Sequence, residues 1–267
     1  MRLPSFSAGS DPGPSFSDLL RRTGSLPEWA RTGEGPPPVP VTHATTIVAL
    51  RYAEGVVMAG DRRATEGHSI AHRAIEKVFP ADRHSGVSIA GAAGPAVEMV
   101  RLFQTELEHY EKVEGTALSL EGKANKLGQM VRSNLPMALE GLAVVPIFAG
   151  YDLRRRTGRI FKYDLTGGRY EEADFHATGS GGRDARTTIK LGYREGLDRA
   201  AAIELAVEGL YQAADEDAAT GGPDVVRGIY PTVATITAQG FGRVPDAEVA
   251  ERFGALIRNK TAEGHQP

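Results

Sequence analysis

Two adjacent threonines, Thr45 and Thr46, stand where a proline-rich head meets a run of strand-forming residues. A threonine hydroxyl is a poor nucleophile unless a base accepts its proton. If the chain is cut before Thr45, the freed α-amine can be that base, because its pKa is about 8 in isolation. A threonine at the start of a strand is also ordinary, since its β-branched side chain suits a pleated sheet.

Asp61 and Lys77 could assist such a nucleophile. Both lie at the ends of predicted strands, where side chains from neighbouring strands converge, and Lys77 has the apolar neighbours Ile75, Val78 and Phe79. A buried ammonium beside the hydroxyl would lower the pKa of the hydroxyl and of the α-amine, and a carboxylate would hold the lysine in place. Taken alone, these residues also fit an edge lysine with an apolar stem and a surface turn at Asp61.

Composition argues against several other chemistries. The chain has no cysteine, which excludes thiolate metal sites, disulfides and a cysteine nucleophile. Its seven histidines lack ligand spacing, so neither a metal nor a cofactor is expected. The glycine cluster at 179–185 lacks the Lys-Ser/Thr ending of a phosphate-binding loop. A net charge of -3 without a basic run argues against nucleic-acid binding.

The location expected from the sequence is the cytoplasm. No apolar run approaches the roughly 18 residues that a membrane helix needs. The first residues lack the basic, apolar and small-residue pattern of a secretion signal. The absence of cysteine fits a reducing compartment.

Residues 1–44 form a separable head. They hold eight of the 16 prolines, with frequent serine and glycine, and show no sustained apolar period. Such a segment cannot bury enough surface to offset the entropy of ordering it, so it is predicted to be flexible.

From Thr45 the pattern changes to alternating groups of strands and helices. The sequence predicts a hairpin formed by TTIVALRY and GVVMAGDRRAT, another around a turn at 82–86, and a third formed by LAVVPIFAGYD and GRIFKYDL. A further strand is expected near 170–178 and a late one in TVATITAQG. Helices are predicted at 95–113, about 118–140 with an interruption at Pro136, 182–195, 199–216 and from Asp246. This order favours an α+β sandwich of antiparallel sheets with helices on their outer faces.

The segments TTIVAL and GVVMAGDRRAT together with Lys77 resemble the catalytic β subunit of the 20S proteasome. ELEHYEK, VRSNLP and AADEDAATGGPDVVRGIYPT resemble its actinobacterial members. In that family the aspartate and the lysine follow the nucleophilic threonine by 16 and 32 residues, which are the separations of Asp61 and Lys77 from Thr45. Counting from Thr46 or Thr42 breaks both matches. The resemblance spans about Thr45–Ile257 and implies the four-layer αββα sandwich of N-terminal-nucleophile hydrolases.

The resemblance also implies roles for other residues near the nucleophile. Gly91 would stabilise the oxyanion through its N–H. Ser180 and Asp217 would lie near the terminal amine, and Thr220 stands where the family often has serine. Each could instead be structural, Gly91 as a turn glycine and Ser180 or Asp217 as a helix cap.

Six residues are implied to contact the substrate. Arg63 lies near the site, and the backbone of Thr65 would pair with the substrate as an added strand. The S1 pocket would be uncharged, which predicts a preference for apolar P1 residues. The implied set is Arg63, Ala64, Thr65, Ile75, Ile89 and Ala93.

The same resemblance implies a precursor and an assembly. Residues 1–44 would be a propeptide removed by autocatalytic cleavage between Ala44 and Thr45, where Ala44 replaces the usual glycine. Residues 45–267 would be the catalytic domain, with a disordered tail from about 259. The implied partners are proteasome α subunits and other β copies in four stacked heptameric rings (α7β7β7α7), an ATP-dependent unfoldase ring, and unfolded protein substrates tagged by a ubiquitin-like protein.

Two alternatives remain open at this stage. One is an N-terminal-nucleophile amidohydrolase that acts on a small amide outside any ring. The other is a non-catalytic subunit of the same fold, which would be expected to lack Thr45, Asp61 and Lys77 together.

Overall fold

A computed structural model of the chain describes residues 45–66 and 69–262. The predictions for residues 1–44, 67–68 and 263–267 lie outside the described residues. Within them, no helix is long and apolar enough to cross a lipid bilayer.

Two five-stranded antiparallel sheets form the centre of the described part. The first contains, in spatial order, β10 (Phe175–Gly179), β1 (Thr46–Tyr52), β2 (Gly55–Gly60), β11 (Thr232–Thr237) and β12 (Gly240–Arg243). The second contains β5 (Val78–Asp82), β6 (Ser85–Gly91), β7 (Val144–Asp152), β8 (Thr157–Tyr163) and β9 (Arg169–Glu172). A small separate hairpin joins β3 (Ala64–Glu66) and β4 (Ser69–His72).

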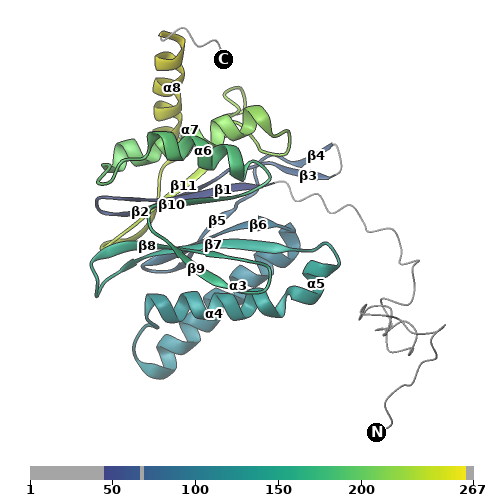
Figure 1. The fold of residues 1–267 in the computed structure, drawn as a ribbon, viewed down its shortest axis with the longest axis vertical. Coiled ribbons are helices and arrows are strands. Elements are labelled where there is room, and N and C mark those ends of the chain that lie inside the picture. The colour runs from purple at the N-terminus through teal and green to yellow at the C-terminus, as the bar shows by residue number, and fades with distance from the viewer. Residues whose placement is uncertain (1–44, 67–68, 263–267) are drawn as a thin grey trace, which may run out of the picture. The chain divides into compact units, whose positions relative to one another are not determined.

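Helices cover the outer face of each sheet (Figure 1). The first sheet carries α6 (Gly182–Gly192) and α7 (Arg199–Glu216), and α8 (Asp246–Ala262) packs against α7. The second sheet carries α3 (Ala93–Glu114) and α4 (Leu120–Ser133), which is followed by the short α5 (Leu135–Leu139). The predicted four-layer αββα sandwich is therefore confirmed.

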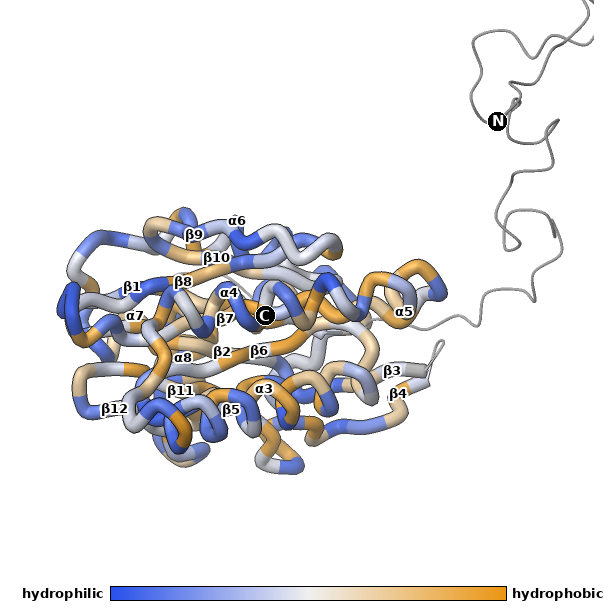
Figure 2. The backbone as a smooth tube through the Cα atoms, turned by 90° about the horizontal axis from the view of Figure 1, so that it is seen from below, coloured by the Kyte–Doolittle hydropathy of each residue, from blue (hydrophilic) through white to orange (hydrophobic). Residues whose placement is uncertain are grey.

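The sandwich is held by three apolar clusters, one between the sheets and one under each helical layer. In β1, Ile47 and Ala49 pack against the second sheet, whereas Val48 and Leu50 pack toward α7, because successive side chains of a strand point to opposite faces. Both faces of β1 are covered, which explains its unbroken apolar run. Figure 2 shows the apolar segments, in orange, running through β2 and β6.

Two sequence-based element predictions were wrong in detail. The single strand expected near 170–178 is two strands in different sheets: β9 pairs with β8, and β10 pairs with β1. Apolar periodicity cannot reveal this change of sheet, because both pieces are extended. The interruption expected at Pro136 within 118–140 is present, but the two helices divide at Asn134, and Pro136 lies in the first turn of α5, where its missing N–H costs least.

Short elements and one terminus also differ from expectation. The strands β3, β4 and β12 span only three or four residues each, too few to establish a period in the sequence. The helix α6 ends at Gly192 rather than at residue 195. The helix α8 continues through Ala262, so residues 259–262 are helical and not part of a disordered tail.

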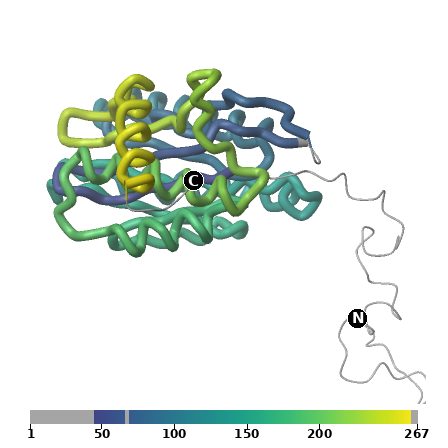
Figure 3. Tube along the Cα trace, turned by 90° about the horizontal axis from the view of Figure 1, so that it is seen from above, coloured from purple at the N-terminus to yellow at the C-terminus, as the bar shows by residue number. Residues whose placement is uncertain are grey.

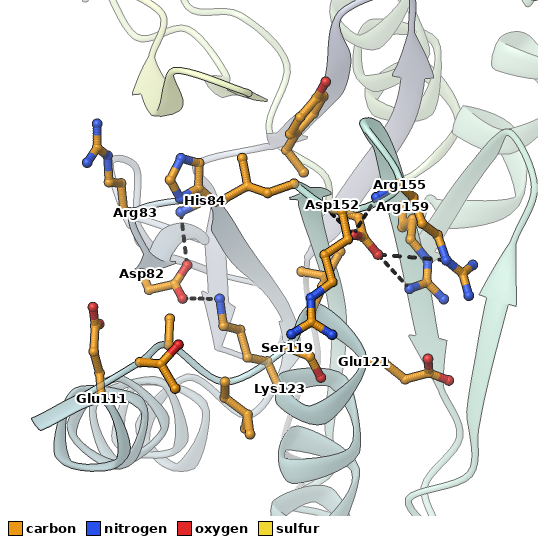
Figure 4. A pocket seen from close by; sticks show the side chains of 17 residues that line it. Asp82, Arg83, His84, Glu111, Ser119, Glu121, Lys123, Asp152, Arg155 and Arg159 are labelled. Atoms are coloured by element: carbon orange, nitrogen blue, oxygen red, sulfur yellow. Dashed lines mark hydrogen bonds and ion pairs between the residues drawn. The ribbon is translucent and has the colours of Figure 1, made fainter. Parts of the chain in front are cut away.

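A cavity of about 550 Å³ lies among the turns at the end of the second sheet opposite to Gly91 (Figure 4). Two of its acidic residues, Asp82 and Asp152, have partners within the protein. Asp82 accepts hydrogen bonds from the His84 N–H (3.0 Å) and the Ser85 hydroxyl (2.6 Å) and forms an ion pair with the buried Lys123. Asp152 pairs with the buried Arg159 at 3.1 Å. These contacts fix the turns that close this end of the sandwich.

The Asp82–Lys123 pair yields a stability prediction. Asp82→Asn leaves the ammonium of Lys123 buried without a counter-charge, so we expect the free energy of unfolding to fall by about 2 kcal/mol, less than for a fully buried pair. The matched control is Glu108→Gln, which removes an exposed ion pair with Lys112 and should leave stability unchanged within error. Urea unfolding measures both variants, and equal effects of the two would contradict the prediction.

Candidate active site

Thr45 lies directly before β1, the strand that neighbours the edge strand β10 in the first sheet. β1 begins at Thr46, which pairs with Gly179, and the carbonyl of Thr45 accepts a 2.9 Å hydrogen bond from the N–H of Ser180. Gly179 has φ +102°, and a Cβ there would lie 1.7 Å from the Thr45 carbonyl oxygen. Only glycine allows this close approach. Thr45 is therefore held against β10 and is buried, with 5% exposure.

Asp61, directly after β2, is fully buried and accepts four hydrogen bonds. Oδ1 accepts from the N–H of Thr46 (2.8 Å) and from Lys77 Nζ (2.6 Å). Oδ2 accepts from the N–H groups of Arg63 (2.9 Å) and Gly221 (2.8 Å). A buried carboxylate is tolerated when its oxygens are paired in this way. The prediction that Asp61 holds Lys77 in place thus agrees with the geometry.

Lys77, directly before β5, is 3% exposed. Its Nζ donates to Asp61 Oδ1 and, at 2.6 Å, to the carbonyl oxygen of Arg63. Burial lowers the pKa of the Lys77 ammonium below its usual range, while the charge of Asp61 acts in the opposite direction. An edge lysine with its head in water is therefore excluded, and so is a surface turn at Asp61.

A second buried network runs from Thr46 to Asp217. The two hydroxyls of Thr46 and Thr220 lie 2.6 Å apart, and Thr220 donates to Asp217 Oδ2 at 2.6 Å. A hydroxyl has one proton to donate, so Thr220 must accept from Thr46. The oxygen of Thr46 in turn accepts from the N–H of Gly181 at 2.9 Å. The series of hydrogen bonds therefore runs in one direction, with each group donating to the next, from the N–H of Gly181 through the hydroxyls of Thr46 and Thr220 to the carboxylate of Asp217.

Asp217 is the acceptor at the end of that chain. Its burial disfavours the charged form, but hydrogen bonds from the hydroxyls of Ser180 and Thr220 outweigh this and hold the pKa of Asp217 below its usual range. Asp217 also ends α7, where it accepts from the N–H of Ala219 at 3.1 Å. Ser180 is not the N-cap of α6, because that position is Gly181 and no side chain caps it.

Gly91 ends β6 opposite Val144 with φ +113°. A Cβ there would lie 2.0 Å from the carbonyl oxygen of Ala143, so the position requires glycine on structural grounds alone. Its role at the oxyanion stays a prediction.

The residues predicted to contact substrate come from segments beside Lys77. Ile89, in β6, donates its N–H to the carbonyl of Lys77 at 3.0 Å, and the N–H of Ile75 donates to the carbonyl of Arg62 at 3.1 Å. Ala64 and Thr65 lie in β3, and Ala93 is the first residue of α3. Arg63 donates from its guanidinium to the carbonyl of Ala218 at 2.8 Å. The backbone thus brings β3, β5, β6 and the loop after α7 to one end of the sandwich.

Thr46 is the residue whose part in the site the sequence did not reveal. A threonine at the start of a strand is ordinary, yet the N–H of Thr46 belongs to the network of Asp61 and its hydroxyl belongs to the network that ends at Asp217. One feature points to it in retrospect: side chains alternate along a strand, and a threonine hydroxyl on a buried face needs a partner. The contributions of Gly181 and Gly221 could not be predicted from the sequence, because each is a backbone N–H that any residue except proline carries.

The arrangement could activate a hydroxyl nucleophile at Thr45. It combines a threonine directly before β1 with a buried lysine that an aspartate and a backbone carbonyl hold in place. In the described residues no group of three or more His, Cys, Asp or Glu side chains is placed to hold a metal ion. The fold and this site define the class of N-terminal-nucleophile hydrolases.

Residues 41–227 match the family model described as Proteasome subunit. A proteasome subunit beta of Acidimicrobium ferrooxidans is 62% identical over 269 residues, covering 98% of this chain and 97% of that protein. Another, of Acidothermus cellulolyticus, is 62% identical over 239 residues, covering 88% and 82%. A third, of Streptomyces griseus subsp. griseus, is 54% identical over 257 residues, covering 95% and 91%.

The chain belongs to the proteasome subunit family. The predicted resemblance to actinobacterial proteasome β subunits is confirmed, and with it the predicted role as a β subunit of the proteasome core, a protease. Similarity over nearly the whole length of these relatives disfavours a small-amide hydrolase outside any ring.

The hydrogen bonds of the Thr46 hydroxyl give a stability prediction. Thr46→Val keeps the side-chain shape but leaves the N–H of Gly181 without an acceptor and Thr220 without its donor, so we expect the free energy of unfolding to fall by about 2 kcal/mol. Thr46→Ser keeps the hydroxyl and should lose less than about 1 kcal/mol, the cost of one methyl group. Thermal and urea unfolding of both variants measures the difference. Equal losses of stability would contradict the assigned hydrogen bonds of the Thr46 hydroxyl.

Proposed function

We propose that this chain is a threonine endopeptidase whose nucleophile is Thr45, released when residues 1–44 are removed autocatalytically. The observation that carries the proposal is the convergence on Asp61, whose Oδ1 accepts from both Lys77 and the N–H of Thr46. They support the proposal because the shared carboxylate links a buried cation to the backbone N–H of Thr46, the residue directly after the proposed nucleophile.

Peptide hydrolysis would proceed in two stages. The Oγ of Thr45 attacks the scissile carbonyl while the free α-amine of Thr45 takes its proton, directly or through a water. The tetrahedral oxyanion is stabilised by the N–H of Gly91. Collapse breaks the C–N bond, the protonated amine gives its proton to the leaving amine, and water then hydrolyses the ester.

Before cleavage the α-amine is part of the Ala44–Thr45 peptide bond, so the precursor would be inactive. The same hydroxyl would attack that bond to release residues 1–44. Lys77 supports the reaction electrostatically, and the network of Thr46, Thr220 and Asp217 fixes the backbone that carries Thr45.

The assembly expected for this protein follows from its family. We propose that the chain joins α subunits and other β copies in four stacked heptameric rings, α7β7β7α7, in the cytoplasm. An ATP-dependent unfoldase ring would deliver unfolded polypeptides, including ones tagged by a ubiquitin-like protein. Neither a metal nor another cofactor takes part in the proposed reaction.

Replacing Thr45 tests the nucleophile. Thr45→Ala removes the hydroxyl, so we expect the precursor to keep residues 1–44 and peptide hydrolysis to fall by at least about 10³-fold. Thr45→Ser keeps a hydroxyl and should be processed and active at a reduced rate. Thr42→Ala, a threonine in the same head, is the control. Mass spectrometry and a fluorogenic peptide provide the readouts, and an active or processed Thr45→Ala variant would rule out this nucleophile.

The uncharged residues proposed for the S1 pocket predict its preference. Ala64, Ile75, Ile89 and Ala93 offer no partner for a charged side chain, so burying one there would be costly. Peptides ending in Leu or Tyr should be cleaved at least about tenfold faster than those ending in Arg or Glu. Steady-state hydrolysis of the four fluorogenic peptides checks this, and dominance of Arg or Glu would be inconsistent with the assignment.

A further inference from the structure

Arg62 and Glu76 are the chain neighbours of the two residues that form the buried ion pair of the site. Arg62 directly follows Asp61, and Glu76 directly precedes Lys77. The guanidinium of Arg62 donates to Glu76 Oε1 at 3.0 Å, so a second ion pair joins the same two segments with the opposite polarity. We call Arg62–Glu76 the outer pair and Asp61–Lys77 the inner pair. The proposed reaction gives the outer pair no role.

The two pairs differ in burial and are linked by the backbone between them. The side chains of Arg62 and Glu76 are 15% and 33% exposed, whereas the inner pair is buried. The N–H of Ile75 donates to the carbonyl of Arg62 at 3.1 Å, so the two backbones lie side by side at this point. One contact would let the segments pivot about it. A second ion pair on the outward side, together with this backbone bond, fixes their register.

Glu76 also ties its segment to the first sheet. Its Oε2 accepts from the hydroxyl of the buried Thr232, the first residue of β11, at 3.0 Å. Its Oε1 accepts from Arg243, the last residue of β12, at 3.1 Å. The carbonyl of Lys77, in contrast, accepts from the N–H of Ile89 in the second sheet. The segment 75–77 is therefore bonded to both sheets.

This bridge bears on the site because the two members of the inner pair come from different sheets. Asp61 follows β2 of the first sheet, and Lys77 precedes β5 of the second. The cluster between the sheets is apolar, and apolar contacts are non-directional. Hydrogen bonds have preferred distances and angles. The outer pair can therefore fix the position of Lys77 relative to Asp61 more sharply than the apolar contacts between the sheets.

Arg62 and Arg243 share one carboxylate oxygen but belong to different parts of the fold. Both also lie 3.8 Å from the carboxylate of Asp246, the first residue of α8, which is the yellow helix of Figure 3. Of the two arginines, Arg62 stands beside Asp61 in the chain. The loss of Arg62 should therefore affect the inner pair, and the loss of Arg243 should not.

We propose that Arg62 and Glu76 are positioning residues of the hydrolytic reaction, and that their ion pair holds the Lys77 ammonium in its working position against Asp61. This rests on the proposed function of Thr45. All the contacts lie within one subunit, so the role requires no surface of the subunit to be exposed in the assembled rings. Loss of the outer pair should slow the chemical step and leave substrate binding unchanged, because neither side chain is among the proposed substrate contacts.

The test uses assembled, processed particles and a fluorogenic peptide that ends in Leu. Arg62→Met and Arg243→Met each keep an apolar stem and remove one cation from Glu76. We expect Arg62→Met to lower kcat by about tenfold, with KM within about twofold of the wild-type value. Arg243→Met should change kcat by less than about twofold. Rates are expressed per subunit that begins at Thr45, counted by mass spectrometry, so that lost folding or processing does not lower them.

Further variants separate positioning from structural damage. Arg62→Lys keeps the charge and should hold kcat within about threefold of the wild-type value. Arg62→Met/Glu76→Gln should be no slower than Arg62→Met alone, because both substitutions break the same ion pair. If Arg62→Met does not assemble, the nearly isosteric Glu76→Gln replaces it and should lower kcat by about threefold, because a hydrogen bond to a neutral amide is weaker than one to a carboxylate.

Four results would overturn the inference: equal kcat values for Arg62→Met, or for its replacement, and Arg243→Met; a change confined to KM; an Arg62→Lys variant as slow as Arg62→Met; or a double variant whose loss is the product of the single losses. Failure of the proposed function is recognised separately, because particles carrying Thr45→Ala would then still cleave the peptide.

Discussion

The buried carboxylate of Asp61 is the constraint on which the rest of the site depends. A charge without solvent must have its lone pairs occupied, and Asp61 recruits its four donors from four separate segments. The start of β1, the residues after β2, the lysine before β5 and the loop after α7 must therefore all arrive together. Removing any one donor would leave an oxygen of this buried carboxylate short of one hydrogen bond, with no solvent to replace it.

Thr46 joins this carboxylate to a second one. Its N–H serves Asp61, and its hydroxyl passes through Thr220 to Asp217, so the backbone beside Thr45 is held from both sides. Gly179 completes the arrangement, because only a residue without Cβ lets β10 approach the carbonyl of Thr45. Rigid placement of a reacting group is a major source of catalytic power, so under the proposed mechanism these residues would contribute to catalysis by positioning Thr45.

Much of this could be predicted from the sequence, for identifiable reasons. Period-two patterns and turn residues predicted the three hairpins, and the separations of Asp61 and Lys77 from Thr45 selected one threonine among several. The partition of residues 169–179 between two sheets could not be predicted, because β9 and β10 look alike locally and differ only in their neighbours. The same holds for Gly181 and Gly221, whose contribution is a backbone N–H, and for the hydroxyl of Thr46, whose partner Thr220 lies 174 residues away.

In the proposed mechanism, cleavage of the Ala44–Thr45 peptide bond frees the α-amine of Thr45 and so activates its hydroxyl. The most direct measurement is the intact mass and N-terminal sequence of the subunit isolated from assembled wild-type particles. The account predicts the loss of residues 1–44 and Thr45 as the first residue, with a free amine. A mature chain that begins at any other residue, or an active particle whose subunits all retain the head, would contradict it.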